Sequence, residues 1–322
     1  MNDRILAIFE QHADEFVSGE QLSEMLQCSR TAIWKHIQAL KEAGYEFEAV
    51  SRRGYRLLRQ PDRWSAVKLL AALKTRTMGR RLKLLDEVDS TQTVAHQLAL
   101  EGADEGTLVV AEQQLAGRGR MGKAWHSPKG KGIWMSLVLR PTIPMHFTPQ
   151  LTLLTAVAVC RAIRKLAGVP AAIKWPNDIL IEGRKVCGIL LESVAEDERL
   201  RYVIAGIGIS VNLEQDDYPD ELRPIATSLR LAAGREIDRI ALLTLVLEEF
   251  EALYTLYHEH GFEPIRTSWE ALTMSLGGQV RANTAKGTIT GTALAIDEMG
   301  ALIVETEAGD TIKLYSAEIQ HA

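Results

Sequence analysis

A segment rich in glycine and arginine is the first place in this sequence where residue types could do chemistry. The sequence GTLVVAEQQLAGRGRMGK places Gly117, Arg118, Gly119 and Arg120 shortly after an apolar run. Glycines let backbone N–H groups come close to phosphate oxygens, and arginines add charge and forked donors. The spacing matches neither the Walker loop nor the dinucleotide fingerprint. The pattern predicts an anion-binding loop, and the alternative is a flexible basic loop without a ligand.

A second group of polar residues lies in the sequence KWPNDILIEGRKVCGIL. Lys174, Asn177 and Asp178 stand at the end of an expected strand, and Lys185 returns on the next strand. A lysine that points into a buried site beside an arginine loop suits a substrate whose carboxylate becomes a phosphate ester. The alternatives are that the lysines are surface residues and that Asp178 caps the turn after Pro176.

These residues lie in the middle of the chain, where strands and helices alternate from Ser65 to about Leu272. Apolar runs bounded by turns predict strands, and longer apolar runs with helical spacing predict helices. The expected strands are 106–114, 132–141 and 201–213, with a strand, a loop and a hairpin over 171–193, and the expected helices are 151–168 and about 239–257. We expect a mixed α/β domain to carry the chemistry.

The first sixty residues follow a different pattern. Apolar positions at helical spacing begin at Ile5, Ser18 and Gln21 form an N-cap pair, and Ser29 is the N-cap of a second helix that stops at Gly44. The sequence FEAVSRRGYRLL then predicts a β-hairpin. Two helices with a tight turn and a following hairpin indicate a winged helix-turn-helix.

Local charge suggests what this first segment binds. Residues 28–60 carry seven Lys and Arg and three Glu, a net charge of +4 within a chain whose net charge is −5. Basic groups on a second helix and on a hairpin tip are placed for phosphate and groove contacts. The expected DNA-binding residues are Ser29, Arg30, Thr31, Lys35, His36, Arg52 and Arg53. The alternative is a small helical domain that binds protein.

The tail from Gly277 differs again, with short alternating segments separated by glycine-rich turns. This pattern predicts a small SH3-like β-barrel. With a linker at Pro61-Asp62, the chain is expected to hold three domains: a winged helix over 1–62, a catalytic domain over 63–272 and the β domain over 273–322. The fold class is α+β, multidomain.

Composition excludes several classes of protein. The chain has 322 residues, of which 46% are hydrophobic and 25% charged, and its longest apolar runs are too short to span a membrane. The N-terminus does not read as a signal peptide. The three cysteines, Cys28, Cys160 and Cys187, are odd in number and lack metal-ligand spacing. We therefore expect a cytoplasmic protein without a membrane partner.

Taken together, the motifs resemble those of the biotin protein ligase family, in order along the whole chain. The winged helix resembles the bifunctional class, which represses genes of biotin synthesis and uptake. The matching segments are Asp89-Ser90-Thr91-Gln92, Gly117 to Arg120 with Trp125 and Ser127-Pro128, Lys174 to Asp178, Lys185 to Leu190, Gly206 to Ile209 and Ala226 to Leu229. Two positions depart from the family pattern: Gln92 and Ser210 stand where the family often has Asn.

The resemblance implies a reaction in two halves. The carboxylate of biotin attacks the α-phosphorus of ATP, which gives biotinyl-5′-AMP and pyrophosphate. A lysine of a biotin carboxyl carrier protein, from acetyl-CoA or pyruvate carboxylase, then attacks the mixed anhydride. Because two anions must first meet, catalysis should rest on positioning and charge neutralisation.

The resemblance also implies a role for each residue of the two motifs. Arg118 and Arg120 would clamp carboxylate and phosphate, Lys185 would bridge the biotin carboxylate and the forming adenylate, and Asp178 would accept the proton of the acceptor lysine. These four are the expected catalytic residues. The expected substrate-binding residues are Ser90, Thr91, Gln92, Gln114, Gly117, Arg118, Gly119, Arg120, Trp125, Lys174, Asn177, Lys185, Gly206 and Gly208. Among them, Gly206 and Gly208 would leave room for the biotin bicycle, and Trp125 would cover the ligand.

Further expectations concern partners and mobility. Mg²⁺ should enter with ATP, largely through the phosphates, so no metal ligand is assigned. We expect residues 112–130 to be partly disordered without ligand and to order around the adenylate. The adenylate should then favour a homodimer that binds operator DNA.

Two other functions are compatible with parts of this pattern. A plain transcription factor would need a small-ligand domain, but not the arginine–glycine loop together with Lys185. A lipoate or octanoyl ligase would share the catalytic architecture without the complete set of motifs and the winged helix. Formation of a bound adenylate from labelled biotin and ATP separates the three functions.

Overall fold

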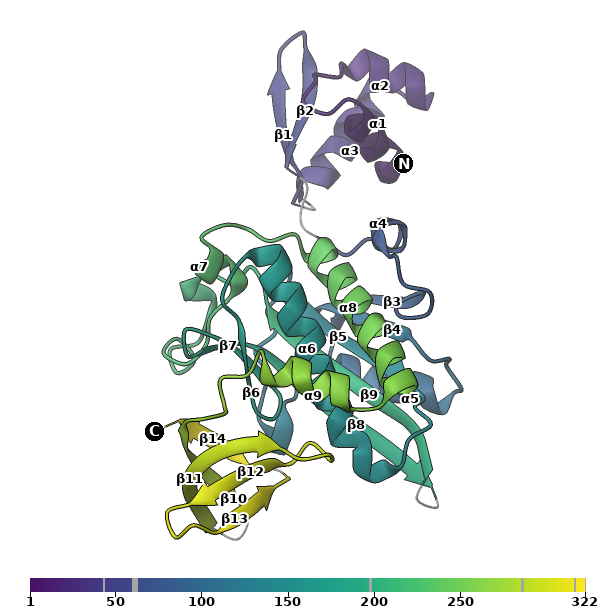
Figure 1. Ribbon diagram of the computed structural model, residues 1–322. Coiled ribbons are helices and arrows are strands. Elements are labelled where there is room, and N and C mark those ends of the chain that lie inside the picture. The colour runs from purple at the N-terminus through teal and green to yellow at the C-terminus, as the bar shows by residue number, and fades with distance from the viewer. Residues whose placement is uncertain (43, 60–62, 197–198, 285–286, 316, 322) are drawn as a thin grey trace. The chain divides into compact units, whose positions relative to one another are not determined.

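The chain forms two compact units, Met1–Arg63 and Trp64–Ala322. The computed structural model describes residues 1–42, 44–59, 63–196, 199–284, 287–315 and 317–321 (Figure 1). The predicted linker at Pro61-Asp62 lies outside the described residues.

The first unit has the expected winged helix-turn-helix elements. Its helices are α1 (Asn2–Gln11), α2 (Gly19–Leu26) and α3 (Arg30–Glu42), and the hairpin consists of β1 (Glu46–Val50) and β2 (Gly54–Arg59). A capping box begins α2, because the Gln21 amide N–H donates to Ser18 Oγ and the Ser18 N–H donates to Gln21 Oε1. Ser29 caps α3 in the predicted way, by accepting from the N–H of Ala32 at 3.2 Å. The three helices and β1 enclose a core that includes Ile5, Leu22, Ile33, Ile37 and Phe47.

A seven-stranded mixed sheet forms the centre of the second unit. Its strands are β3 (Arg81–Val88), β4 (Thr107–Gln114), β5 (Gly132–Leu139), β9 (Arg199–Ser210), β8 (Arg184–Glu196), β7 (Asp178–Ile181) and β6 (Ala172–Lys174), in that spatial order. The β3–β4 pair is parallel and the remaining pairs are antiparallel. The strands expected over 106–114, 132–141 and 201–213 are β4, β5 and β9.

Helices cover both faces of this sheet. Successive side chains of a strand point to opposite faces. Leu108 and Val110 of β4 therefore join the main core with helices α6 (Thr148–Ala167), α8 (Arg239–His260) and α9 (Glu263–Glu270). Val109 instead packs with α5 (Thr91–Leu100) on the other face. The shorter helices are α4 (Ala66–Ala72) and α7 (Leu229–Ala233).

The C-terminal segment forms the small antiparallel β structure expected from its pattern. Its five strands are β10 (Gln279–Thr284), β11 (Gly287–Ile296), β12 (Leu302–Thr306), β13 (Thr311–Leu314) and β14 (Glu318–His321), in the order β13-β12-β11-β10-β14. This sheet is joined to the rest of the second unit by the buried indole of Trp175, whose Nε1 donates to the carbonyl of Gly300 at 3.1 Å.

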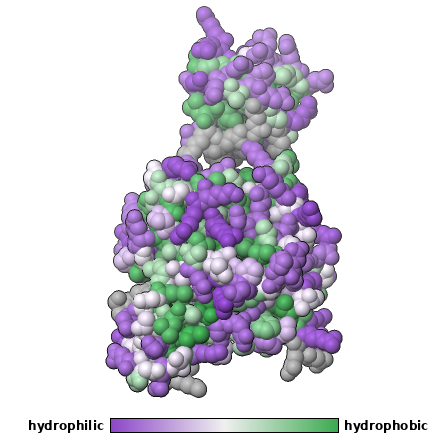
Figure 2. All heavy atoms as spheres, viewed as in Figure 1, coloured by the Kyte–Doolittle hydropathy of each residue, from purple (hydrophilic) through white to green (hydrophobic). Residues whose placement is uncertain are grey.

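The surface is mixed in character. Figure 2 shows apolar side chains in small patches among hydrophilic ones on the viewed face. Among the described residues, no helix is long and apolar enough to cross a membrane.

Candidate functional site

A cavity of about 490 Å³ lies in the second unit, on the face of the sheet that carries α5. The alternation along β9 places it there, because Ile207 and Ile209 belong to the main core whereas Ile204 packs with α5. Gly206 and Gly208, between these residues, face the cavity. Of the predicted substrate-binding and catalytic residues, all line this cavity except Gly117.

Glycines at neighbouring positions make a floor without side chains. Gly208 pairs with Gly188 on β8, and each lies under the indole of Trp125. A Cβ on Gly208 would lie 2.3 Å from Trp125 Nε1, and a Cβ on Gly206 would lie 2.4 Å from Gln92 Oε1. The room that the sequence assigned to biotin beside these two glycines is thus filled by protein side chains in the structure.

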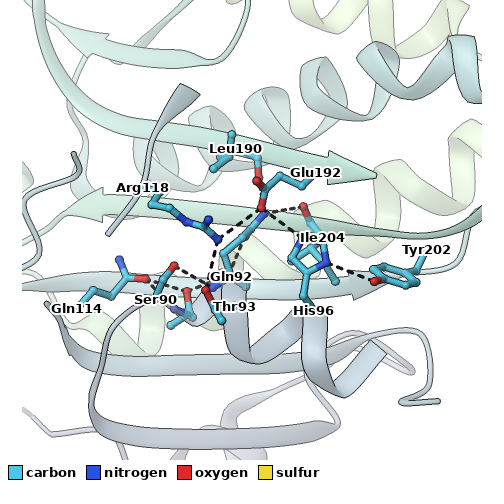
Figure 3. Close-up of polar contacts among 12 residues, drawn as sticks. Ser90, Gln92, Thr93, His96, Gln114, Arg118, Leu190, Glu192, Tyr202 and Ile204 are labelled. Atoms are coloured by element: carbon cyan, nitrogen blue, oxygen red, sulfur yellow. Dashed lines mark hydrogen bonds and ion pairs between the residues drawn. The ribbon is translucent and has the colours of Figure 1, made fainter. Parts of the chain in front are cut away.

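A buried polar network borders the floor (Figure 3). Gln114 Oε1 accepts from the N–H of Thr91 at 2.9 Å, and Ser136 Oγ donates to Gln92 Oε1 at 3.0 Å. Gln92 Nε2 in turn donates to two backbone carbonyls at 3.3 Å each. Ser90 is the N-cap of α5. Sequence reasoning missed Ser136, although a lone serine in the apolar strand GIWMSLVL was a usable signal.

The glycine–arginine segment folds as a small hairpin. The N–H of Trp125 donates to the Gly117 carbonyl at 2.8 Å, and the N–H of Gly119 donates to the Lys123 carbonyl at 2.7 Å. Met121 lies at the tip with a φ of 57°. Gly117 is needed for packing, since a Cβ there would lie 2.7 Å from the Trp125 carbonyl oxygen. Gly117 is not part of the cavity lining. Its role is to let the two arms of the hairpin come close together.

The start of the segment predicted to be mobile is fixed within the core. Glu112 lies in β4, with 6% of its side chain exposed, and its carboxylate pairs with the fully buried guanidinium of Arg239 at 2.9 Å. The same carboxylate accepts from the N–H of Trp64 at 2.6 Å, and Arg239 donates to the Gly132 carbonyl at 3.1 Å. The expectation of disorder from residue 112 onward is therefore wrong for Glu112, and the hairpin begins only after β4 ends at Gln114.

The two arginines of the hairpin reach opposite walls. Arg118 Nη2 donates to Thr93 Oγ1 at 3.3 Å and lies 4.0 Å from the Glu192 carboxylate, and Figure 3 shows its guanidinium turned toward these residues. Arg120 Nη1 donates to Asn177 Oδ1 at 2.9 Å. The hairpin thus contacts the Lys174–Asp178 segment. The glycine–arginine loop and the lysine motif, which we expected to share one site, lie side by side.

The predicted lysine and carboxylate are partners. Lys185 Nζ lies 2.7 Å from Asp178 Oδ1, and it lies 5.2 Å from the centre of the Trp125 ring system. Lys174 lines the same cavity. The cavity therefore collects cations from the hairpin, β6 and β8, which suits a ligand with more than one anionic group.

The far wall is centred on Tyr218, an aromatic residue that sequence reasoning did not select, and it includes two positions that the family resemblance had marked, Ser210 and Ala226. Tyr218, Leu222 and Ala226 line it, with Ser210 at the end of β9. Ala317 and Ile319 of the C-terminal sheet also contribute to the lining. An aromatic in the loop sequence DDYPDE gave no signal of its own.

The predicted DNA-binding residues lie on the first unit, where a cleft separates the start of α3 from the hairpin. Arg30, Thr31 and Arg52 line this cleft together with Trp34, which is 53% exposed and was missed by sequence reasoning. His36 differs from the others, because its Nδ1 lies 2.8 Å from Asn2 Oδ1 of α1 and the side chain is partly buried.

The remaining predicted residues of this surface are exposed or stacked. Ser29 and Lys35 are exposed. Arg53 lies over the Phe16 ring, 4.2 Å from its centre. Six of the seven predicted residues are therefore available on the surface of the unit, and His36 has a structural partner.

Comparisons with known proteins agree with both units. Sequence models match for the Biotin/lipoate A/B protein ligase family over residues 84–210, for an HTH domain over 3–56 and for the Biotin protein ligase C terminal domain over 275–322. The chain is 52% identical to the bifunctional ligase/repressor BirA of Bacillus spizizenii, over 98% of this chain and 97% of that protein. It is 31% identical to BirA of Escherichia coli over 94% of each.

Solved structures of biotin protein ligases also match the chain. The biotin protein ligase of Aquifex aeolicus in complex with biotin and ATP is 31% identical, with a TM-score of 0.65 over 76% of this chain and 99% of that one. Together with the near full-length matches, the polar, cationic and aromatic walls of one cavity show that the chain belongs to the biotin protein ligase family, in its bifunctional ligase/repressor group.

Proposed function

We propose that this protein uses ATP to form biotinyl-5′-AMP, transfers the biotin to a lysine of a biotin carboxyl carrier protein, and represses transcription in response to biotin. One observation carries the proposal: a single cavity holds a buried polar network, the cations Arg118, Arg120 and Lys185, and an aromatic wall. These three surroundings suit, in turn, the ureido ring of biotin, the reacting anions and a nucleotide base. The relatives named as bifunctional ligase/repressors support the same pair of activities.

In the first half-reaction an oxygen of the biotin carboxylate forms a bond to the α-phosphorus of ATP, and pyrophosphate leaves. The carboxylate and the triphosphate repel each other, so the main work of the protein is to neutralise charge at the place where they meet. Lys185 and the hairpin arginines reach this place from different elements. Thr91, Gln114 and their neighbours orient biotin from the α5 side.

In the second half-reaction the neutral amine of the acceptor lysine attacks the acyl carbon of the mixed anhydride, and AMP leaves with the bonding electrons. We assign Asp178 as the acceptor of the amine proton. Its carboxylate lies 2.7 Å from Lys185. When the adenylate draws Lys185 toward its phosphate, the carboxylate loses its cationic partner and is left free to take the amine proton.

Trp125 has to move for this chemistry. Its indole lies over Gly208 and Gly188, and its buried Nε1 has no hydrogen-bond partner among the described residues. A ligand that occupies the glycine floor displaces the ring, which can then cover the ligand from the hairpin side. This exchange links ligand binding to rearrangement of the hairpin.

We propose that Mg²⁺ arrives with ATP and is held mainly by its phosphates. The described lining of the cavity offers one carboxylate, Asp178. That fits a cation which takes most of its ligands from phosphates and water. Bound there, it would supply charge neutralisation at the triphosphate.

The repressor activity is assigned to the first unit. Arg30, Thr31, Lys35 and Arg52 would contact operator DNA, and a homodimer that forms with the adenylate would double these contacts. We place the protein in the cytoplasm, as its composition and cysteine usage suggest. We also retain the division of the second unit at 272/273, which the C-terminal family match beginning at residue 275 supports.

The ligase proposal is tested by incubating the full-length protein with radiolabelled biotin and ATP, then with a carrier domain. A labelled adenylate should stay with the protein and pass to the carrier lysine. Absence of adenylate from a folded full-length preparation would refute the ligase assignment.

The repressor proposal is tested by gel shift with the operator. Affinity should increase with biotin plus ATP, and Arg30→Ala should weaken binding, whereas Arg201→Ala, an exposed arginine of the second unit, should not. Equal operator affinity with and without biotin and ATP would refute it.

A further inference from the structure

Helix α3 of the first unit presents a large aromatic side chain to solvent. Trp34 is 53% exposed, whereas Ile33, Ile37 and Leu40 of the same helix are buried in the core of the unit. These buried positions follow the helical period, so one face of α3 packs on the core and Trp34 lies outside that face. A single exposed apolar residue is common on protein surfaces. The surroundings of Trp34 are therefore what make it informative.

The neighbours of Trp34 are basic. Trp34 lines the cleft between α3 and the hairpin, together with Arg30 from α3 and Arg52 from the hairpin. Arg30 precedes it by four positions, so the two side chains lie on the same face of the helix, one turn apart. Lys35 beside it is exposed. Residues 28–60 carry a net charge of +4, which favours contact with the phosphates of DNA. The indole thus belongs to the surface that is assigned to the operator.

An indole differs from its basic neighbours in what it can bind. It carries no charge that could neutralise a phosphate, but it offers a large apolar ring and one N–H donor. Side chains in the first turns of a recognition helix reach the edges of bases in the major groove, and Trp34 stands at the start of the second turn of α3. This inference rests on the proposed repressor function, and it deepens that function by naming a group of the operator that is read.

The chemistry of the indole selects one of the four bases. Thymine presents its C5 methyl group in the major groove, and its O4 beside that methyl accepts a hydrogen bond. Guanine and adenine offer acceptors but no methyl group. Cytosine offers an amino donor, which cannot pair with an indole N–H that only donates. Thymine alone satisfies both the ring and the N–H.

We propose that Trp34 reads a thymine of the operator, through contact between its indole ring and the C5 methyl group in the major groove. The basic residues around it bind phosphates, which position the helix without reading the sequence. The basic residues therefore set the affinity for DNA in general, and Trp34 contributes to the preference for one sequence.

The test begins by defining the operator with the full-length protein. Wild-type protein, with biotin and ATP present, selects its tightest-binding duplexes from a pool of random DNA. The variant is Trp34→Ala, and the matched control is Leu58→Ala. Leu58 is also exposed (57%), but it lies on β2 and does not line the cleft. Because both side chains are exposed, both variants should keep the fold, which circular dichroism checks.

Each thymine of the selected duplex is then replaced in turn by deoxyuridine, which pairs with adenine as before and lacks only the methyl group. At one thymine of the half-site, this replacement should weaken wild-type binding by roughly three- to fivefold, the effect of one buried methyl group. Trp34→Ala should bind the parent duplex roughly tenfold more weakly and should not respond to the same replacement. Leu58→Ala should respond as wild type does.

The salt dependence of binding separates a base contact from a phosphate contact. Trp34→Ala should show the same slope of log affinity against log salt concentration as wild type, because it loses no phosphate contact. Lys35→Ala, which removes an exposed cation of the same helix, should reduce that slope by about one. It should keep the response to deoxyuridine.

Three results would overturn the assignment. The first is a Trp34→Ala variant that binds the parent duplex as tightly as wild type. The second is a selected site in which no thymine methyl group matters to wild type. The third is a deoxyuridine series that affects wild type and Trp34→Ala equally at every position, which would mean that the ring packs on the sugar–phosphate backbone. All three differ from failure of the proposed function, in which wild-type protein would select no duplex or would bind it equally without biotin and ATP.

Discussion

Replacing Arg239 by Met should destabilise the second unit more than most single substitutions would. The guanidinium is fully buried, and it pairs with Glu112, which is also buried, at 2.9 Å. It also donates to the Gly132 carbonyl and lies over the Trp64 ring at 4.6 Å. In Arg239→Met the Glu112 carboxylate keeps the N–H of Trp64 but loses its counter-charge inside the protein.

The size of the effect follows from the burial of both partners. Removing one member of a buried pair typically costs about 3–5 kcal/mol, whereas replacing both by groups of similar volume is often close to neutral. The matched variant is Glu112→Gln with Arg239→Met, in which the glutamine oxygen can still accept from Trp64. We expect the double variant to recover most of the stability that the single variant loses.

The change in the free energy of unfolding is measured by urea unfolding of the full-length protein, followed by tryptophan fluorescence. Five of the six tryptophans lie in the second unit, and Trp34 is the one in the first. A loss below about 1 kcal/mol for Arg239→Met would contradict the expected cost of an unpaired buried charge. A double variant that is no more stable than Arg239→Met would contradict it as well.

Three further predictions concern the site and the C-terminal sheet. Lys185→Ala should slow adenylate formation by roughly a hundredfold or more with an unchanged circular dichroism spectrum. The control is Lys165→Ala, on the exposed side of α6, which should be as active as wild type. If Lys185→Ala formed the adenylate as fast as wild type, Lys185 would have no part in the reaction. Protease cleavage within residues 115–130 should slow when biotin and ATP are added, and cleavage at the same rate would show that the hairpin does not respond to ligand. Burial alone would raise the pKa of Asp297, but Lys313 and two backbone amides hold it below its usual value. A depressed folded-state pKa stabilises the protein above the ordinary pKa of aspartate, and this is lost as the pH falls below about 4; the Tm of wild type should therefore fall more steeply there than that of Asp297→Asn, and parallel Tm curves would contradict it.

The parts of the fold that the sequence predicted are those fixed by local signals. Ser18 and Ser29 are N-caps whose hydrogen bonds involve residues three positions away, so their effect is legible in a short window. The long apolar helix α8 and the apolar strands β4 and β5 are likewise marked by their own composition. Nothing in a short window, however, indicates that β3 and β4 pair in parallel while β4 and β5 pair antiparallel.

The residue types of the site could be predicted from the sequence, but the contacts between those residues could be predicted less well. The motifs identified most polar residues of the cavity, though not Lys123, His126, Ser136 or Tyr218, because glycine, arginine and lysine in such density are unusual outside anion sites. Which side chain lies over which glycine depends on strand register: Gly206 pairs with Ser136 and Leu190, which brings Gln92 above it. The two strand pairings join residues 16 and 70 positions apart, and neither leaves a trace in sequence spacing.

The partner of Lys185 suggests how proton transfer from the acceptor lysine depends on an occupied site. Lys185 Nζ lies 2.7 Å from Asp178 Oδ1. Taking Lys185 from this carboxylate requires another anion, and the biotin carboxylate and the phosphates of the nucleotide supply it. Asp178 is then available as a base only when these anions occupy the cavity, so deprotonation of an acceptor lysine is favoured in the loaded site and not in the empty one.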